Sequence, residues 1–334
     1  MEKHELLGPW IRRFLLEYLI RERNMSPNTQ HSYRDALRVL LPFIAMRAGK
    51  ELDCLQVGDM SADAVRSFLK YIEEQRKVSI QTRNQRLAAI HSLARFIAEL
   101  SPQHIAWYGE IRTIPFKRAS HGLVPYLEKA EINALLDVPD CSTSSGHRNF
   151  VLLLFLYNSG TRASEATSLR ITDLDLEARL HGTASVCIKG KGGKVRRCPL
   201  WKKTAEELAR LIAGRPEKDM VFLNRHGEPL TRFGLYAMVR ECVAQAGKRE
   251  PSLLSKRVSP HTLRHTTATH LLRAGVDINT IRSWLGHVSL DTTQIYAEVD
   301  LEMKARALQK CDIVDRKTTL VTGHRGLMDF LEKI

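Results

Sequence analysis

Two arginines, two histidines and a tyrosine stand out in the second half of this 334-residue chain. A phosphodiester already carries one negative charge, and attack by an oxygen nucleophile places about one more on a five-coordinate phosphorus. Without a metal, positioned side chains must supply the compensating charge. The planar, permanently charged guanidinium of arginine suits the two non-bridging oxygens, and a tyrosine hydroxyl can serve as the attacking group. The side chains that fit these tasks are Arg162, His261, Arg264, His287 and Tyr296.

The spacing of these residues fits a single site. His261 and Arg264 stand three positions apart in a predicted helix, so both project from one face. Arg162 falls in the first turn of another predicted helix, and Tyr296 follows nine positions after His287. Each residue alone has a commoner role, such as a surface arginine or a tyrosine packed against the core. Their joint occurrence therefore indicates phosphodiester chemistry more strongly than any single member does.

A departing alkoxide needs a proton, and a glycine-rich turn supplies a candidate acid. Alternating apolar positions precede residues 190–194, which predicts a β-hairpin with its turn at the glycines. Lys191 lies in that turn, and its flexible side chain could reach the bridging oxygen of a bound phosphate. Lys189 and Lys194 are local competitors for the same role.

One pattern in the same region suits a metal. His261 and His265 stand four positions apart, which is a zinc-ligand spacing on a helix. The sequence offers neither the glutamate of an H-E-x-x-H motif nor a cysteine pair nearby to complete such a site. His265 is therefore expected to pack within the fold, and we predict neither a metal nor another cofactor.

The composition favours a folded protein with a polyanionic partner. Hydrophobic residues make up 43% of the chain and charged residues 26%, and the formal net charge is +14. Such an excess is typical of proteins that bind nucleic acid, with a solvated basic surface as the alternative. The longest apolar run, at 151–157, is far shorter than the ~20 residues of a membrane span. Six scattered cysteines and the lack of a secretory signal at the N-terminus favour a reduced, cytoplasmic protein with no membrane partner.

Two segments must position the candidate residues. Apolar stripes with helical spacing recur in the first hundred residues and predict a helical unit of four helices. Residues 112–122 are basic and interrupted by proline and glycine, which indicates a linker. From residue 123 the pattern predicts further helices around the hairpin, so the expected fold class is mainly α with a small β-hairpin or sheet. The helices expected in this second segment are 128–136, 147–158, 260–274, 279–285 and 289–297.

Basic residues near one helix start and in the linker are candidate phosphate contacts. Arg83, Asn84 and Arg86 lie near the beginning of the fourth predicted helix, where the helix dipole and free N–H groups favour anions. Lys117 and Arg118 add positive charge within the linker. We expect these five residues to contact DNA. The alternative for the helix is a polar face turned to solvent.

The motifs around the candidate residues resemble those of the tyrosine recombinases, the phage-integrase family, and most of all the Xer-type bacterial recombinases. Residues 161–166 resemble the first arginine box of that family, and residues 258–265 resemble its second. Leu285, Gly286 and His287, followed by Tyr296, resemble the closing box. Residues 190–194 resemble the mobile hairpin whose lysine acts as general acid. The resemblance spans about residues 123–300.

The resemblance implies a reaction and a role for each side chain. Tyr296 would attack the phosphate, form a 3′-phosphotyrosyl link and release a 5′-hydroxyl. Arg162, Arg264 and His287 would stabilise the charge of the transition state. Rejoining to a different strand would give site-specific recombination, as integration, excision or resolution, without a cofactor. The other implied roles are a group that helps the tyrosine lose its proton, a general acid and an orienting carboxylate, namely His261, Lys191 and Glu165.

The resemblance also implies an architecture and partners. Residues 1–111 would form a core-DNA-binding domain of SAM-like fold, and residues 123–310 an α+β catalytic domain. The substrate would be double-stranded DNA with paired recombination half-sites, bound by a homo- or hetero-tetramer. Residues 311–334 extend beyond the usual end of the family, which lies soon after a helix expected at about 301–310. The resemblance implies that a C-terminal helix docks on a neighbouring protomer, and either of these two segments could supply it.

Two other functions use parts of the same pattern. A topoisomerase with the same tyrosine chemistry would relax supercoils without paired sites, and a DNA-binding regulator would keep the fold without cleaving. The Xer-like boxes and the four-helix N-terminal segment argue against the first. The complete set of catalytic residue types argues against the second. The target sequence and the element served are not encoded in these motifs.

Overall fold

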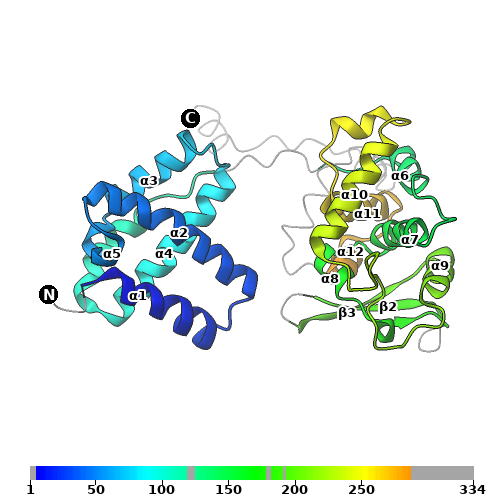
Figure 1. The fold of residues 1–334 in the computed structure, drawn as a ribbon, viewed down its shortest axis with the longest axis horizontal. Helices are drawn as coiled ribbons and strands as arrows, with labels where there is room; N and C mark the ends of the chain where they lie inside the picture. The colour runs from blue at the N-terminus through cyan, green and yellow to red at the C-terminus, as the bar shows by residue number, and fades with distance from the viewer. Residues whose placement is uncertain (1–4, 119–124, 178–181, 191–192, 287–334) are drawn as a thin grey trace, which may run out of the picture. The chain divides into compact units, whose positions relative to one another are not determined.

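The computed structural model describes residues 5–118, 125–177, 182–190 and 193–286. The chain divides into two compact units, Met1–His121 and Gly122–Ile334 (Figure 1). Each unit has its own hydrophobic core. No helix within the described ranges has the length and apolar character needed to cross a membrane.

The N-terminal unit is built from helices. The helices α2 (Pro27–Ala48), α3 (Ala62–Glu74) and α4 (Ile80–Leu100) begin where the hydroxyls of Ser26, Ser61 and Ser79 accept hydrogen bonds from backbone N–H groups three residues ahead. The apolar stripes of these helices meet in the core of the unit. In chain order the elements are α1 (Leu7–Arg13), a π-helix (Phe14–Glu22), α2 (Pro27–Ala48), α3 (Ala62–Glu74), α4 (Ile80–Leu100) and α5 (Ile105–Arg112).

The sequence pattern predicts four helices in this unit, and the structure adds α5. Helical periodicity is weak in this stretch, so the helix depends on packing against the rest of the unit rather than on local pattern. Ile111 is fully buried, and the indole Nε1 of Trp107 donates a hydrogen bond of 2.9 Å to the carbonyl of Met60. The helical region therefore reaches Arg112, where the predicted linker begins.

The second unit combines helices with one small sheet. The predicted helices at 128–136, 147–158, 260–274 and 279–285 are confirmed within a few residues, whereas α9 (Lys202–Ile212) and α10 (Arg232–Ala246) do not follow from the sequence patterns. The helix expected at 289–297 lies outside the described residues. The elements are α6 (Lys129–Leu136), α7 (Ser144–Ser159), α8 (Ala163–Thr167), β1 (Leu174–Asp175), β2 (Ser185–Lys189), β3 (Val195–Pro199), α9 (Lys202–Ile212), α10 (Arg232–Ala246), α11 (Pro260–Arg273) and α12 (Ile278–Leu285).

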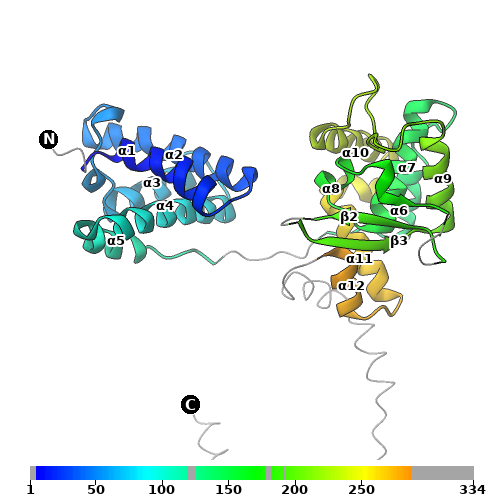
Figure 2. The same cartoon turned by 90° about the horizontal axis from the view of Figure 1, so that it is seen from below.

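The predicted hairpin is confirmed, and its register places one arginine opposite a core residue. β2 and β3 pair antiparallel, with Ile188 opposite Arg196. The short strand β1, which the sequence pattern does not predict, pairs with the other edge of β2 and gives the order β1-β2-β3. Figure 2 shows β3 beside α12, and the two elements are in contact. A mainly helical protein with one small sheet is the fold class that the sequence predicts.

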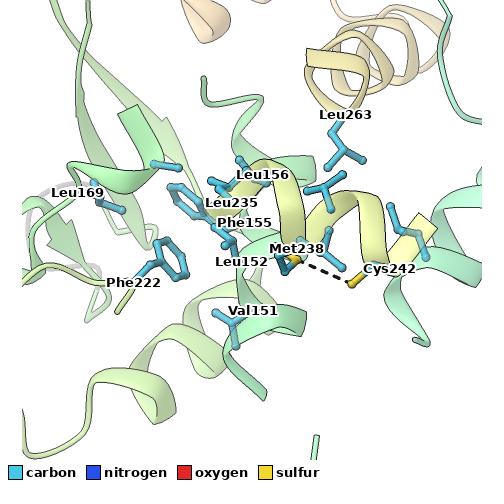
Figure 3. Packing of buried hydrophobic residues seen from close by; sticks show 14 of the residues in the cluster. Val151, Leu152, Phe155, Leu156, Leu169, Phe222, Leu235, Met238, Cys242 and Leu263 are labelled. Carbon is cyan, nitrogen blue, oxygen red and sulfur yellow. Dashed lines mark hydrogen bonds between the residues drawn. The ribbon is translucent and has the colours of Figure 1, made fainter. Parts of the chain in front are cut away.

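The core of the second unit centres on α7. The ring of Phe155 lies 5.7 Å from that of Phe222, and Leu235 and Met238 of α10 belong to the same buried cluster (Figure 3). Leu263 brings α11 into this cluster. The apolar run at 151–157 is therefore the central helix of a globular core. The helices that carry the candidate site residues are attached to this core.

Candidate active site

Arg162 and Glu165 are brought together by the start of a short helix. Helix α7 ends at Gly160, whose φ of 58° lies in the left-handed region, and the chain turns into α8. Arg162 is the N-cap residue of α8, and the carboxylate of Glu165 accepts its backbone N–H at 3.0 Å. The same carboxylate accepts the Nη1 of Arg162 at 2.8 Å. Glu165 is buried, with 6% of its surface exposed, and it holds the partly exposed guanidinium of Arg162 in a fixed position.

Arg264 joins three elements at the centre of the site. It projects from α11, which begins at Ser259 and carries Pro260 in its first turn. Only 3% of its surface is exposed. The guanidinium donates hydrogen bonds of 2.6 Å to the carbonyls of Gly160 and Leu285. The ends of α7 and α12 are therefore both held on Arg264.

His261 lies on α11 three positions before Arg264. Atoms packed around its ring lower its pKa by removing hydration, and the positive charges of Arg264 and Arg162 lower it further. The imidazole is therefore neutral near pH 7 and able to accept a proton. Its ring stacks on that of His265 with 6.1 Å between centroids, and burial lowers the pKa of His265 to about 4.

The glycine-rich turn begins beside Glu165. The backbone N–H of Gly190 donates to the carbonyl of Lys194 at 2.7 Å, and a Cβ at Gly190 would lie 3.4 Å from Oε1 of Glu165. Lys191 follows directly in the chain but lies outside the described residues. Of its two competitors, Lys189 is already in an ion pair, with its Nζ 3.1 Å from Asp173.

Arg196 on β3 also belongs to this site, although the motifs in the sequence do not single it out. Its Nη2 lies 2.7 Å from Oε2 of Glu165, and its Nε donates to the carbonyl of Trp284 at 2.9 Å. Only 9% of its side chain is exposed. A signal was present in the sequence, since Arg196 stands opposite Ile188 in the predicted hairpin and so shares a face with an apolar residue.

Two of the candidate residues lie beyond the end of the described chain. His287 and Tyr296 both follow Gly286, so their side chains are outside the described residues. Gly286 itself closes α12 with a φ of 65°, and a Cβ there would lie 3.1 Å from the Arg196 side chain. Gly286, which directly precedes His287, therefore lies against the Arg196 side chain that pairs with Glu165.

The N-terminal candidates Arg83 and Asn84 hold a neighbouring stretch of chain. Arg83 is 5% exposed, and its Nη1 donates to the carbonyl of Pro115 at 2.8 Å. The Asn84 amide donates to the Lys117 carbonyl at 2.7 Å and accepts the Lys117 N–H at 3.1 Å. Both side chains thus fasten the beginning of the predicted linker to α4.

The other three candidates differ in their surroundings. Lys117 places its Nζ 2.7 Å from Glu73, and Arg118 is exposed. Nη1 of Arg86 is buried without a hydrogen-bond partner, and burial lowers the pKa of this guanidinium, helped by the charge of Arg76. Nε of Arg83 is likewise buried without a hydrogen-bond partner, although its Nη1 binds the Pro115 carbonyl. Arg86 and Arg118 therefore remain the stronger candidates for phosphate contacts, because Arg83 is held by Pro115. No group of three potential metal ligands occurs among the described residues of either unit.

Comparisons with known proteins cover almost the whole chain. Residues 125–303 match the description "Phage integrase family", and residues 11–99 match "Phage integrase, N-terminal SAM-like domain". A protein of Sinorhizobium fredii named "Putative integrase/recombinase y4rC" is 38% identical over 336 residues, which is 100% of both chains. The tyrosine recombinase XerC of Pelotomaculum thermopropionicum is 31% identical over 88% of this chain and 95% of its own.

Two solved structures share the fold. The Tn1549 transposon integrase in complex with transposon right end DNA superposes with a TM-score of 0.67 at 19% identity, over 90% of this chain and 98% of its own. The XerH site-specific recombinase bound to palindromic difH substrate, a post-cleavage complex, gives a TM-score of 0.65 at 24% identity. That match covers 88% of this chain and 83% of the other.

Proposed function

The chain belongs to the phage integrase family and is a site-specific tyrosine recombinase, and on this premise we propose that Tyr296 is its covalent nucleophile. Tyr296 attacks the scissile phosphate, forms a 3′-phosphotyrosyl link and expels a 5′-hydroxyl. Attack by the 5′-hydroxyl of another strand reverses the step and completes the exchange. One ester replaces another at each stage, so the reaction consumes no cofactor. The topoisomerase and regulator alternatives are not favoured by these relatives.

The observation that carries this proposal is the convergence of three guanidiniums at the ends of α7 and α12. Arg162 and Arg196 share the carboxylate of Glu165, and Arg264 and Arg196 together donate to the backbone carbonyls of Gly160, Leu285 and Trp284. Two positive charges therefore remain in excess, which matches the roughly two negative charges of a phosphorane-like transition state. Arg162 keeps part of its surface open toward solvent, where a phosphate can be bound.

Two groups transfer protons in this mechanism, one to activate the nucleophile and one to protonate the leaving group. The neutral imidazole of His261 accepts the proton of Tyr296 as the hydroxyl attacks. Lys191 donates a proton to the departing 5′-oxygen, since the turn that carries it begins beside Glu165. His287 joins Arg162 and Arg264 in binding the non-bridging oxygens.

The substrate is double-stranded DNA with paired half-sites, bound by a homo- or hetero-tetramer. Structures of XerH with difH substrate and of a lambda integrase dimer at a COC′ core site support the DNA partner. The net charge of +14 supports it independently. In this assignment the N-terminal unit binds the core DNA, residues 123–310 catalyse, and residues 311–334 dock on a neighbouring protomer. A DNA substrate of this kind places the protein in the cytoplasm.

The nucleophile is tested with a nicked suicide duplex, on which the released strand diffuses away and traps the covalent complex. Wild-type protein should give an adduct that survives denaturing electrophoresis. Tyr296→Phe removes one oxygen and should abolish the adduct while half-site binding persists. Tyr236→Phe on α10 is the matched control and should behave as wild type. An adduct that persists in Tyr296→Phe assigns the attack to another residue.

A further inference from the structure

We propose that Arg196 is a positioning residue, which holds Arg162 in place for the scissile phosphate by sharing the carboxylate of Glu165. This inference rests on the proposed function, because it assigns Arg162 to the phosphate. Arg196 itself lies behind the carboxylate and acts through it.

The carboxylate of Glu165 is divided between the two arginines. Its Oε1 accepts Nη1 of Arg162 at 2.8 Å and Nη1 of Arg196 at 3.2 Å. Its Oε2 accepts the backbone N–H of Arg162 at 3.0 Å and Nη2 of Arg196 at 2.7 Å. Arg196 therefore grips Glu165 with both ends of its guanidinium, and the carboxylate cannot rotate without breaking two charge-assisted bonds.

The third donor of Arg196 fixes its own position. Nε donates to the carbonyl of Trp284 at 2.9 Å, and the side chain lies against Gly286 at the end of α12. The guanidinium thus connects β3, α8 and α12 with every nitrogen of its head group engaged. His287 follows α12 in the chain. Arg196 therefore contacts both Glu165, in the first arginine box, and the helix that precedes the closing box.

The charge of Arg196 has a specific effect on Arg162. If Glu165 faced Arg162 alone, its full negative charge would cancel the charge that the phosphate needs. Arg196 takes half of the hydrogen bonds of the carboxylate, so Arg162 retains charge and free N–H groups for the substrate. A purely structural role explains this less well, since apolar residues of similar volume stabilise a buried site as much as an ion pair does.

The test uses full-length protein with Arg196→Gln, Arg196→Lys and the control Arg197→Gln. Arg197 lies next to Arg196 on β3 but is exposed and donates to Ser185, so its loss removes the same charge from the other face of the strand. Two suicide duplexes are compared, one with a normal scissile phosphate and one with a methylphosphonate at that position. The methyl group removes one anionic oxygen, so the reaction depends less on positive charge around the phosphorus.

On the normal duplex, Arg196→Gln should cleave about 100-fold more slowly than wild type, because a misplaced Arg162 loses its alignment with the phosphate. On the methylphosphonate the deficit should shrink to less than about 10-fold, because less charge needs stabilising. Arg196→Lys keeps the charge but not the fork, and its deficit should fall between these values. Half-site binding and the rates of Arg197→Gln should match wild type.

Two results overturn the inference. Equal deficits of Arg196→Gln on both duplexes would show that Arg196 only supports the fold, and wild-type rates on both would show that Glu165 positions Arg162 unaided. If Arg196→Gln does not fold, Arg196→Lys decides by the same comparison. Failure of the proposed function is recognised separately, because wild-type protein would then form no tyrosine-linked adduct on the normal duplex.

Discussion

A hydrogen bond of 2.6 Å joins Nη1 of Arg264 to the carbonyl oxygen of Gly160, although 104 positions separate the two residues in the chain. Gly160 adopts the left-handed conformation, with a φ of 58°, at the residue whose carbonyl accepts this bond. The other end of the guanidinium holds the carbonyl of Leu285. One side chain thus sets the distance between the first arginine box and the closing box.

Gly160→Ala should destabilise the catalytic unit and impair cleavage. A Cβ at this position would overlap Cδ2 of Leu285, and the φ of 58° is strained for alanine. The strain costs about 1–2 kcal/mol, and the overlap adds about 1–3 kcal/mol. Urea unfolding measures the loss. Gly214→Ala is the control, with a φ of 72° and no atom within 4 Å, and should lose only the strain. Equal losses in both variants would mean that Leu285 moves aside freely.

Lys191→Ala should be slow only where the leaving oxygen needs a proton. A positioned general acid contributes about 10²–10⁴-fold, so cleavage of normal DNA should fall by that factor. A duplex with sulfur at the bridging position has a better leaving group and should be cleaved at nearly the wild-type rate. Lys189→Ala is the matched control, because its ammonium is paired with Asp173. A similar deficit of Lys191→Ala on both duplexes would instead assign this lysine to phosphate binding.

Stability of the catalytic unit should fall as the pH drops from 7.5 to 5, in part because of His265. Its folded pKa of about 4 lies below the ordinary value of about 6.5. Between these values the unfolded chain binds more protons, so acid favours unfolding. His265 should account for about 2 kcal/mol of the loss at pH 5. Urea titrations of wild type and His265→Gln at both pH values give the difference. An identical pH dependence would show that His265 is protonated equally in both states.

The salt dependence of DNA binding should distinguish arginines that contact phosphates from an arginine that only binds the protein backbone. Arg86→Gln and Arg118→Gln should each reduce the slope of log affinity against log salt by about 0.9, the value for one phosphate contact. Arg83→Gln should leave the slope unchanged, because its guanidinium binds the Pro115 carbonyl. Gel-shift titrations on a half-site measure the slopes. A reduced slope for Arg83→Gln would mean that this arginine leaves Pro115 for a phosphate.

The fold class and most helix positions follow from the sequence, because periodic apolar residues and capping serines act locally. The contacts of Arg196 and Arg83 do not follow from it. Arg196 meets Glu165 across 31 positions, and Arg83 meets Pro115 across 32, so neither pairing leaves a periodic signal. Helix α5 was missed for a related reason, since tertiary packing of Ile111 and Trp107 replaces a strong local stripe. The spacing of motifs therefore predicts which residue types take part in the reaction. Only the folded structure shows that Arg162 and Arg196 share the carboxylate of Glu165.

The two hydrogen bonds between the Asn84 amide and the backbone of Lys117 have a consequence for protein engineering. The Asn84 side chain satisfies both the N–H and the carbonyl of Lys117, as a paired β-strand would do. Residues 115–117 therefore fold with the N-terminal unit. A chimaera that exchanges N-terminal units between relatives should therefore be joined after Lys117. A junction at the end of α5 would combine the α4 of one relative with residues 115–117 of another. The hydrogen bonds between Asn84 and Lys117 would then be lost, and with them the DNA specificity of the exchanged unit.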